Sequence, residues 1–221
     1  MRQVFQKALV SLVSLTAMIL TAGRVSADIP SPPKDTMAMM KGTQTAVLAG
    51  GCFWGMEGVF ERLKGVVDVT SGYSGGDADT AHYEMVGSGT TGHAESIQIH
   101  YDPSQISYGT LLKVFFTVAH DPTELDFQGP DYGSQYRSAI FYANEGQKEV
   151  ADGYIRALDQ AKVFPKPIVT QVVPLKAFYP AEDYHQHFLD RNPGYPYIVF
   201  YDLPKIATLK RMFPQLVASK S

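Results

Sequence analysis

From Thr43 onward, blocks of apolar residues alternate with polar ones and predict strands and helices in turn. Some blocks are short apolar runs or alternate with a period of two, as expected of buried strands. These strands are predicted at residues 45–49, 66–73, 95–101, 139–142 and 168–174. Longer blocks carry apolar residues at helical spacing, at 53–63, 107–119 and 145–163. The order of the elements predicts helices packed against a sheet.

This order favours an α+β fold, a two-layer sandwich of helices on a mixed sheet with a ferredoxin-like core. Residues 74–93 form a polar stretch too long to be a simple connection between elements. Beyond Pro174 the chain is rich in aromatic residues and proline, so we expect an irregular C-terminal wrap around the core. No linker interrupts the pattern, and residues 43–221 are therefore predicted to form a single catalytic domain.

Residues 1–27 have the pattern of a signal peptide. Two basic residues, Arg2 and Lys7, precede an apolar run at 8–22, and small residues lead to Ala27. The alternative is a retained membrane anchor, but the run is short for a bilayer span, so we expect cleavage after Ala27. Residues 28–42 are proline-rich and lack hydrophobic periodicity, which predicts a flexible mature N-terminus.

A signal peptide implies an exported protein, located in the periplasm or, alternatively, outside the cell. Removing residues 1–27 takes away three basic residues and no acid, so the net charge changes from −3 to −6. An acidic chain of this kind gives no indication of a nucleic-acid partner. After cleavage we expect no membrane association, and we expect a monomer.

Cys52 is the only cysteine of the chain, so an intrachain disulfide is excluded. A lone cysteine in an exported protein indicates an intermolecular bridge or a reactive thiol, and a buried inert cysteine is the alternative. Gly50 and Gly51 predict a sharp turn that places Cys52 at the start of the helix at 53–63. There the helix dipole and free amides are expected to lower the thiol pKa toward neutrality.

Two large aromatic residues, Phe53 and Trp54, follow the cysteine directly. They could line an apolar pocket beside the sulfur, or they could belong only to the core. Glu95 offers a second clue, because the alternation of its strand places it on one face with Ile97 and Ile99. Burial there would favour the neutral carboxyl group, which could act as a general acid near neutral pH. The other reading is a strand end that turns toward solvent.

Loop residues supply further candidate ligand groups. Asp131 and Tyr136 lie in a loop before the strand at 139–142, and Tyr83 lies in the long polar stretch. Such side chains can hydrogen-bond to a polar ligand atom, although a solvated loop has the same composition. His185 and His187 are two residues apart and would diverge on a helix, so we expect no metal site.

Four segments together resemble one family. They are GCFWG at 51–55, GTTGHAE at 89–95, GPDYGSQYRSAIF at 129–141 and FYPAEDYHQ at 178–186. In this order and spacing, the chain resembles methionine sulfoxide reductase A, the peptide-methionine (S)-S-oxide reductase, over about residues 43–197. The resemblance implies an oxidoreductase that repairs oxidised methionine, free or in exported proteins.

The resemblance also implies a role for each candidate residue. Cys52 would attack the sulfoxide sulfur and Glu95 would protonate the departing oxygen, with Tyr83 and Tyr136 as hydrogen-bond donors. The products would be methionine and a sulfenic acid on Cys52. The remaining candidates would bind the substrate: Phe53 and Trp54 would enclose its S-methyl group, and Asp131 would shape the site.

The chain departs from many members of this family in one respect, because it lacks the further cysteines that reduce the sulfenic acid by forming an internal disulfide. We therefore expect no bound cofactor and an external thiol reductant. In the cell this would be an exported thioredoxin-like protein, and in vitro dithiothreitol could replace it.

Two other functions are compatible with the residues alone. A cysteine hydrolase or acyltransferase would pair Cys52 with a histidine such as His185. A non-catalytic binding module would use the 13 tyrosines and 12 phenylalanines to contact peptide or glycan. The first would turn over esters or amides without a reductant, and the second would not need Cys52.

Overall fold

The computed structural model describes residues 29–33, 35 and 42–218. The predicted signal peptide lies outside the described residues, as does much of the segment 28–42. Where that segment is described, it contacts helix α3 (Tyr108–Val114). The Asp35 carboxylate accepts hydrogen bonds from the Gly109 amide at 3.0 Å and from the Ser107 hydroxyl.

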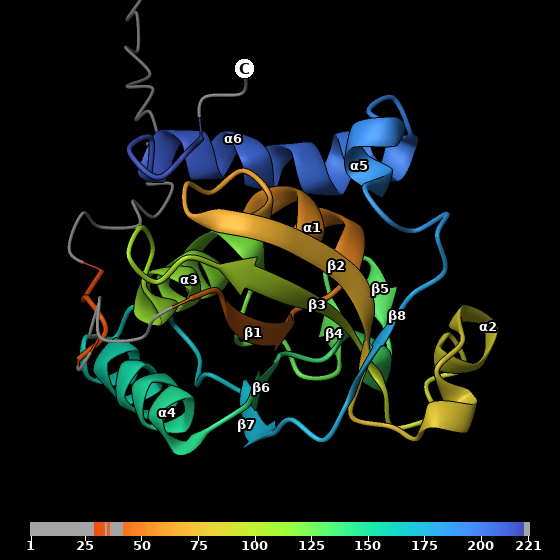
Figure 1. Ribbon diagram of the computed structural model, residues 1–221, viewed down its shortest axis with the longest axis horizontal. Coiled ribbons are helices and arrows are strands. Elements are labelled where there is room, and N and C mark those ends of the chain that lie inside the picture. The colour runs from red at the N-terminus through yellow and green to blue at the C-terminus, as the bar shows by residue number, and fades with distance from the viewer. Residues whose placement is uncertain (1–28, 34, 36–41, 219–221) are drawn as a thin grey trace, which may run out of the picture.

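A six-stranded sheet forms the centre of the molecule (Figure 1). Its strands are β1 (Gln44–Ala49), β2 (Val66–Ser74), β3 (Ala94–Tyr101), β6 (Ala139–Tyr142), β7 (Gln171–Pro174) and β8 (Phe178–Pro180). They lie in the order β7-β6-β1-β3-β2-β8, and all pairs are antiparallel except β6 with β7. The four central strands β6-β1-β3-β2 have the order of a ferredoxin-like core. The predicted α+β fold with a mixed sheet is confirmed.

The three predicted helices are present with earlier ends. They are α1 (Phe53–Phe60), α3 and α4 (Glu145–Gln160). Helix α3 passes into a wider π-helical turn, η2 (Phe115–Ala119). Polar residues fix the beginnings of two helices, because Ser107 Oγ accepts the Thr110 amide at 3.0 Å and Asn144 Oδ1 accepts the Gln147 amide at 3.0 Å.

Helix α1 is covered on two sides, by the sheet and by helix α6 (Leu203–Met212), which runs across it (Figure 1). Every residue of α1 except Trp54 is buried. By helical spacing Glu57 lies off the apolar stripe that Met56, Val59 and Phe60 form, yet Glu57 is only 1% exposed. Segments more than 120 residues later in the chain cover the face that lies off this stripe.

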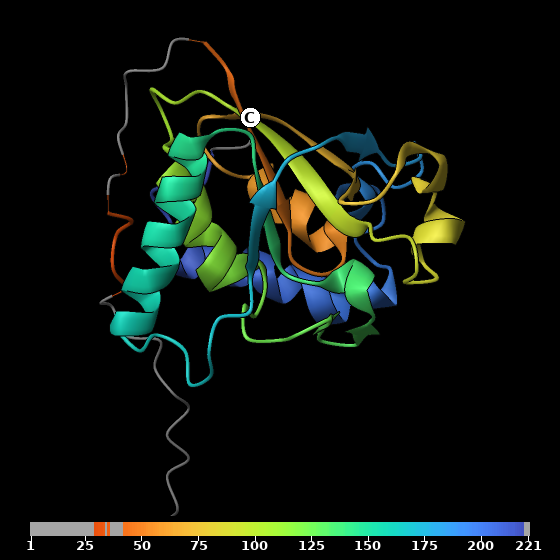
Figure 2. The same cartoon turned by 90° about the horizontal axis from the view of Figure 1, so that it is seen from below.

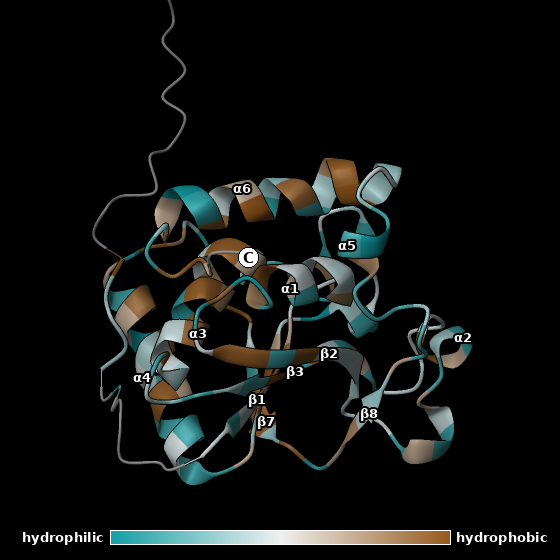
Figure 3. Ribbon diagram, turned by 45° about the horizontal axis from the view of Figure 1, so that its top comes forward, coloured by the Kyte–Doolittle hydropathy of each residue, from teal (hydrophilic) through white to brown (hydrophobic). Residues whose placement is uncertain are grey.

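The C-terminal part wraps the core as expected, but it is not irregular throughout. After β8 it forms α5 (Phe188–Arg191), a π-helical turn η4 (Ile198–Asp202) and α6. In α6, Ile206 and Leu209 are buried, and hydrophobic and hydrophilic segments alternate along it in Figure 3. Pro204 lies in the first turn of α6, where proline is compatible with a helix.

The long polar stretch contains two short elements, η1 (Ala78–Thr80) and α2 (Tyr83–Val86). They lie on the side of the molecule away from α4 in both ribbon views (Figures 1 and 2). A two-stranded ribbon of β4 (Phe127–Gln128) and β5 (Asp131–Tyr132) precedes a short turn η3 (Ser134–Tyr136). Within the described part of the chain, no helix has the length and hydropathy needed to cross a bilayer.

Candidate active site

The chain turns sharply between β1 and α1, and this turn places the cysteine. Gly51 has φ +90°, in the left-handed region, and a Cβ atom there would lie 2.5 Å from Gln128 Cγ. A residue with a side chain would be strained and would collide with Gln128. The turn leaves Cys52 as the residue that precedes the first turn of α1.

Glu95 is brought to the same end of α1 by the pairing of β3 with its neighbours. It lies opposite Tyr73 of β2, and its side chain is buried with 4% of the residue exposed. Glu95 Oε2 accepts the Phe53 amide at 3.1 Å. Burial raises the pKa of Glu95 to about 8, and the nearby Asp131 adds to the effect although the Phe53 amide opposes it. Glu95 is thus a buried carboxyl that holds its proton at neutral pH.

A cavity of about 210 Å³ opens at this end of α1. It is lined by Cys52, Phe53, Trp54, Tyr83, Glu95, Asp131, Tyr136, Tyr195 and Tyr197. All seven candidates from the sequence border it, although they come from α1, α2, β3, β5, η3 and the turn before α1. The walls combine one thiol, two carboxyl groups and aromatic rings, which suits a small ligand with both apolar and polar parts.

The Cys52 thiol is buried, with 8% of the residue exposed, and this changes the expected electrostatics. Burial raises the pKa of the thiol well above its usual value, and the carboxyl groups of Glu95 and Asp202 raise it further. The Trp54 amide and Lys205 act in the opposite direction but are outweighed. The expectation of a pKa lowered toward neutrality is therefore wrong for the unliganded protein, because burial exceeds the effect of the helix N-terminus.

Trp54 is held by contacts around its indole ring. The ring stacks on Phe188 with centroids 3.8 Å apart, and it meets Tyr195 and Tyr197 edge to face at 6.2 and 5.9 Å. Its Nε1–H donates to His185 Nδ1 at 3.1 Å. These contacts fix the orientation of an apolar surface beside the sulfur.

The hydroxyl groups of Tyr83 and Tyr136 at the cavity remain protonated at neutral pH. Burial, followed by the effect of Glu95, raises the pKa of Tyr83 to about 12 and raises that of Tyr136 as well. Both are therefore available as hydrogen-bond donors. Asp131 accepts a hydrogen bond from the Tyr197 hydroxyl, while burial raises the pKa of the Asp131 carboxyl.

Glu182 positions Tyr83, and the sequence analysis did not identify it. Its carboxylate accepts the Tyr83 amide at 2.9 Å and the Tyr73 hydroxyl at 2.8 Å. It thereby joins the start of α2 to β2. Glu182 lies in the segment 178–186, one of the four segments that resemble the family, and this could have indicated a role at the site. Tyr195 and Tyr197 were also missed, because no role was assigned to the sequence around them.

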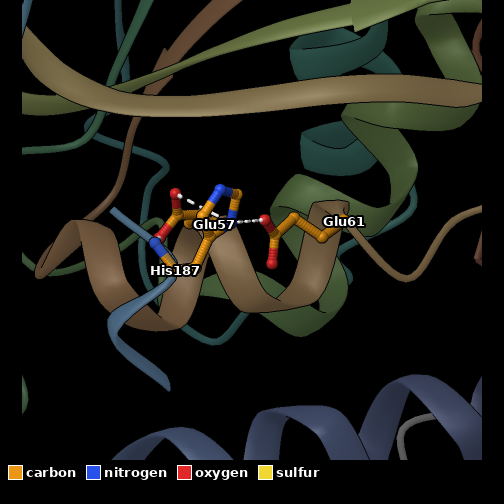
Figure 4. A group of neighbouring side chains, drawn as sticks. All are labelled: Glu57, Glu61 and His187. Atoms are coloured by element: carbon orange, nitrogen blue, oxygen red, sulfur yellow. Dashed lines mark hydrogen bonds and ion pairs between the residues drawn. The ribbon is translucent and has the colours of Figure 1, made fainter. Parts of the chain in front are cut away.

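Glu57 of α1 and Glu61 at the C-terminal end of this helix form a second cluster with His187, which directly precedes α5 (Figure 4). None of the three lines the cavity. Their donor atoms lie within 4.8 Å of one another, a spacing compatible with a divalent cation. Glu57 Oε2 accepts the His187 amide at 2.9 Å and the His187 ring pairs with Glu61, whereas the buried Glu57 Oε1 has no hydrogen-bond partner among the described residues. These contacts connect α1 to the segment before α5.

His185 is not arranged as a base for Cys52. Its Nδ1 is occupied by the Trp54 indole, and its ring packs 4.4 Å from that of Tyr83. Within the residues that the structure describes, no histidine hydrogen-bonds to the Cys52 sulfur. A hydrolase mechanism would require such a pair.

Comparisons with known proteins identify the family of this chain. A family model described as peptide methionine sulfoxide reductase matches residues 44–216. "Peptide methionine sulfoxide reductase MsrA 2" of Mesorhizobium japonicum is 60% identical over 81% of this chain and 92% of its own length. A protein of the same name from Synechocystis is 50% identical over 87% of this chain and 92% of its own length.

Solved structures give the same result. Mxr1 from Saccharomyces cerevisiae in reduced form has a TM-score of 0.64 and 35% identity, covering 72% of this chain and 92% of that one. Methionine sulfoxide reductase A of Corynebacterium diphtheriae has a TM-score of 0.60 and 35% identity, covering 75% and 84%. The chain therefore belongs to the peptide methionine sulfoxide reductase A family, as an oxidoreductase with a single cysteine.

Proposed function

We propose that Cys52 reduces the S epimer of methionine sulfoxide by attacking its sulfur, with Glu95 as the proton donor to its oxygen. One observation carries this proposal: the only thiol of the chain and a protonated buried carboxyl share a single small cavity. A sulfoxide oxygen is a poor leaving group unless it is protonated. The thiol therefore needs an acid beside it.

The step is balanced in atoms and electrons. A bond forms between the Cys52 sulfur and the substrate sulfur. It breaks again as the oxygen moves to Cys52, so that the S–O bond of the substrate is replaced by an S–O bond on the cysteine. The thiol is oxidised by two electrons to a sulfenic acid, and the sulfoxide is reduced to methionine. Glu95 gives a proton to the oxygen, and the proton of the thiol restores it. Tyr83 and Tyr136 donate hydrogen bonds to the oxygen as its charge grows.

Phe53 and Trp54 provide the apolar surface for the methyl group of the substrate. Trp54 cannot easily turn away, because its ring is stacked on Phe188 and its N–H is bonded to His185. An apolar wall on one side and polar donors on the other orient a sulfoxide, whose carbon and oxygen ends differ in polarity. Asp131, bonded to Tyr197, shapes the polar side.

An external thiol completes the cycle. With no second cysteine in the chain, the sulfenic acid on Cys52 cannot form an internal disulfide. Two thiols supplied from outside reduce it to the free thiol, with release of water and formation of their own disulfide. We propose an exported thioredoxin-like protein as the donor in the cell and dithiothreitol as its substitute in vitro.

The proposed setting is repair of exported proteins by a monomer. It rests on the signal-peptide pattern of residues 1–27, with the periplasm as the address and the medium as the alternative. N-terminal sequencing of protein recovered from periplasm and medium tests this. A mature protein that begins at Asp28 supports export, and a protein that keeps Met1 in the cytoplasm contradicts it.

The activity is tested with both sulfoxide epimers, dithiothreitol, and two proteins, wild type and Cys52→Ser. We expect methionine only from the S epimer and only with the wild type, while circular dichroism shows that both proteins are folded. Activity on esters or amides without a reductant would support a hydrolase instead. A Cys52→Ser protein that retains full function would support a binding module.

A further inference from the structure

Lys205 is a largely buried lysine to which the proposed reaction has assigned no role. It lies in the first turn of α6, with 19% of its side chain exposed. Its Nζ donates to Asp202 Oδ1 at 3.2 Å, and the Asp202 side chain has no exposed surface. Burying an ammonium group costs free energy unless it has partners. The burial of Lys205 therefore needs a physical reason.

The Asp202–Lys205 pair occupies a recess in α1 that exists because residue 55 is glycine. A Cβ atom on Gly55 would lie 2.0 Å from Asp202 Oδ1 and 2.9 Å from Lys205 Nζ. Gly55 is three residues after Cys52, and residues three apart lie on one face of a helical turn. The ammonium group is therefore held beside the same turn as the thiol.

The groups that face Cys52 are otherwise acidic or neutral. Carboxyl groups come from Glu95 on β3, Asp131 on β5 and Asp202 at the end of η4. Hydroxyl groups come from Tyr83, Tyr136 and Tyr197. None of the described residues that line the cavity carries a positive charge.

We propose that Lys205, anchored by Asp202 in the recess at Gly55, is a positioning residue that supplies the positive charge stabilising the ionised Cys52 sulfur during attack. This inference rests on the proposed function, in which the sulfur is the nucleophile. A thiolate in a buried site needs a nearby cation as well as helix amides. Lys205 lowers the thiol pKa, in the direction that this role requires, while Asp202 raises it by a larger amount.

The test is the pH dependence of Cys52 alkylation by iodoacetamide in the full chain. Since the chain has one cysteine, the alkylation rate reports that sulfur alone. Lys205→Met should raise the midpoint by about one pH unit, which makes alkylation about tenfold slower near neutral pH. Lys205→Arg should restore the midpoint, and Asp202→Asn should shift it downward. Lys210→Met, on the exposed side of α6, is the matched control and should have no effect.

A folded Lys205→Met protein with the wild-type midpoint overturns the inference, because a purely structural lysine would change the melting temperature alone. If Lys205→Met does not fold, Lys205→Gln decides: an upward shift of the midpoint supports the inference and an unchanged midpoint overturns it. Alkylation requires no sulfoxide. Failure of this inference is therefore distinguishable from failure of the proposed function, which appears in the sulfoxide assay with the wild type.

Discussion

Two buried carboxyl groups are associated with α1. Glu95 of β3 lies at the N-terminal end of this helix, and Glu57 belongs to its second turn. Each accepts one backbone amide, from Phe53 at 3.1 Å and from His187 at 2.9 Å. Burial is the main cause of a raised pKa in both, to about 8 for Glu95 and about 7 for Glu57. By burial and pKa alone the two are nearly the same.

Their surroundings separate them. Glu95 borders the cavity that contains the thiol, whereas Glu57 faces the His187 and Glu61 side chains (Figure 4). A raised pKa therefore reports burial in both places. Chemistry requires in addition an open space and a nucleophile within it, and only Glu95 has both.

The largest expected effect comes from removing the acid. Glu95→Gln should lower kcat/KM for the S epimer by about a hundredfold or more, because general acid catalysis commonly contributes that much. Glu57→Gln, the matched control, should stay within about threefold of wild type. Steady-state assays with dithiothreitol measure both variants. Equal losses in the two would remove the distinction between the carboxyl groups.

The pH profile of kcat/KM should also distinguish Glu95 from Glu57. The thiol pKa lies above that of Glu95, so the rate should rise about tenfold per pH unit as the thiolate forms, and level near pH 8 where Glu95 loses its proton. Glu95→Gln should continue to rise above pH 8, and Glu57→Gln should level as the wild type does. A Glu95→Gln profile that levels at the same pH would contradict the assignment.

The sequence predicted the site better than it predicted the surroundings of the site. Cys52, Glu95 and the five other candidates lie in segments with a recognisable pattern, and all of them border the cavity. Tyr195, Tyr197 and Lys205 were missed because the C-terminal segment was interpreted as irregular. The helical spacing of Ile206, Leu209 and Phe213 could have predicted α6 from the sequence.

Burial explains the other differences between sequence and structure. Helical spacing leaves Glu57 off the apolar stripe of its helix although it is buried, since local sequence cannot show that α6 and a distant segment cover α1. The direction of the Cys52 pKa was wrong for the same reason: the helix N-terminus is visible in the sequence, but desolvation by residues far along the chain is not. The positions of the main strands and helices were accessible, because their hydrophobic periods are local.

Smaller losses are expected from the hydroxyl donors. Tyr83→Phe and Tyr136→Phe should each lower kcat by about fivefold, corresponding to about 1 kcal/mol for one hydrogen bond in the transition state. Tyr154→Phe is the control, because its hydroxyl is buried outside the cavity and has no hydrogen-bond partner among the described residues. If the three variants behave alike, the tyrosines at the cavity do not contact the reacting oxygen.

Glu57→Gln should have the smallest effect on activity, but it should have a measurable effect on stability. The raised pKa of Glu57 means that the folded state takes up a proton, so its contribution to stability is lost as pH rises from about 5 to 7. Glu57→Gln should therefore gain about 2–3 kcal/mol in unfolding free energy relative to wild type over that range. Denaturant titrations at both pH values check this. A constant difference would show that Glu57 ionises alike in the folded and unfolded states.

In the proposed reaction the Cys52 sulfur accepts the oxygen of the sulfoxide. A single-turnover experiment without any reductant tests it directly, by counting methionine formed and measuring the mass of the intact chain. The account predicts one methionine per chain, a gain of one oxygen atom at Cys52, and no product from Cys52→Ser. Continued turnover without a thiol, or a burst of methionine from Cys52→Ser, would contradict it.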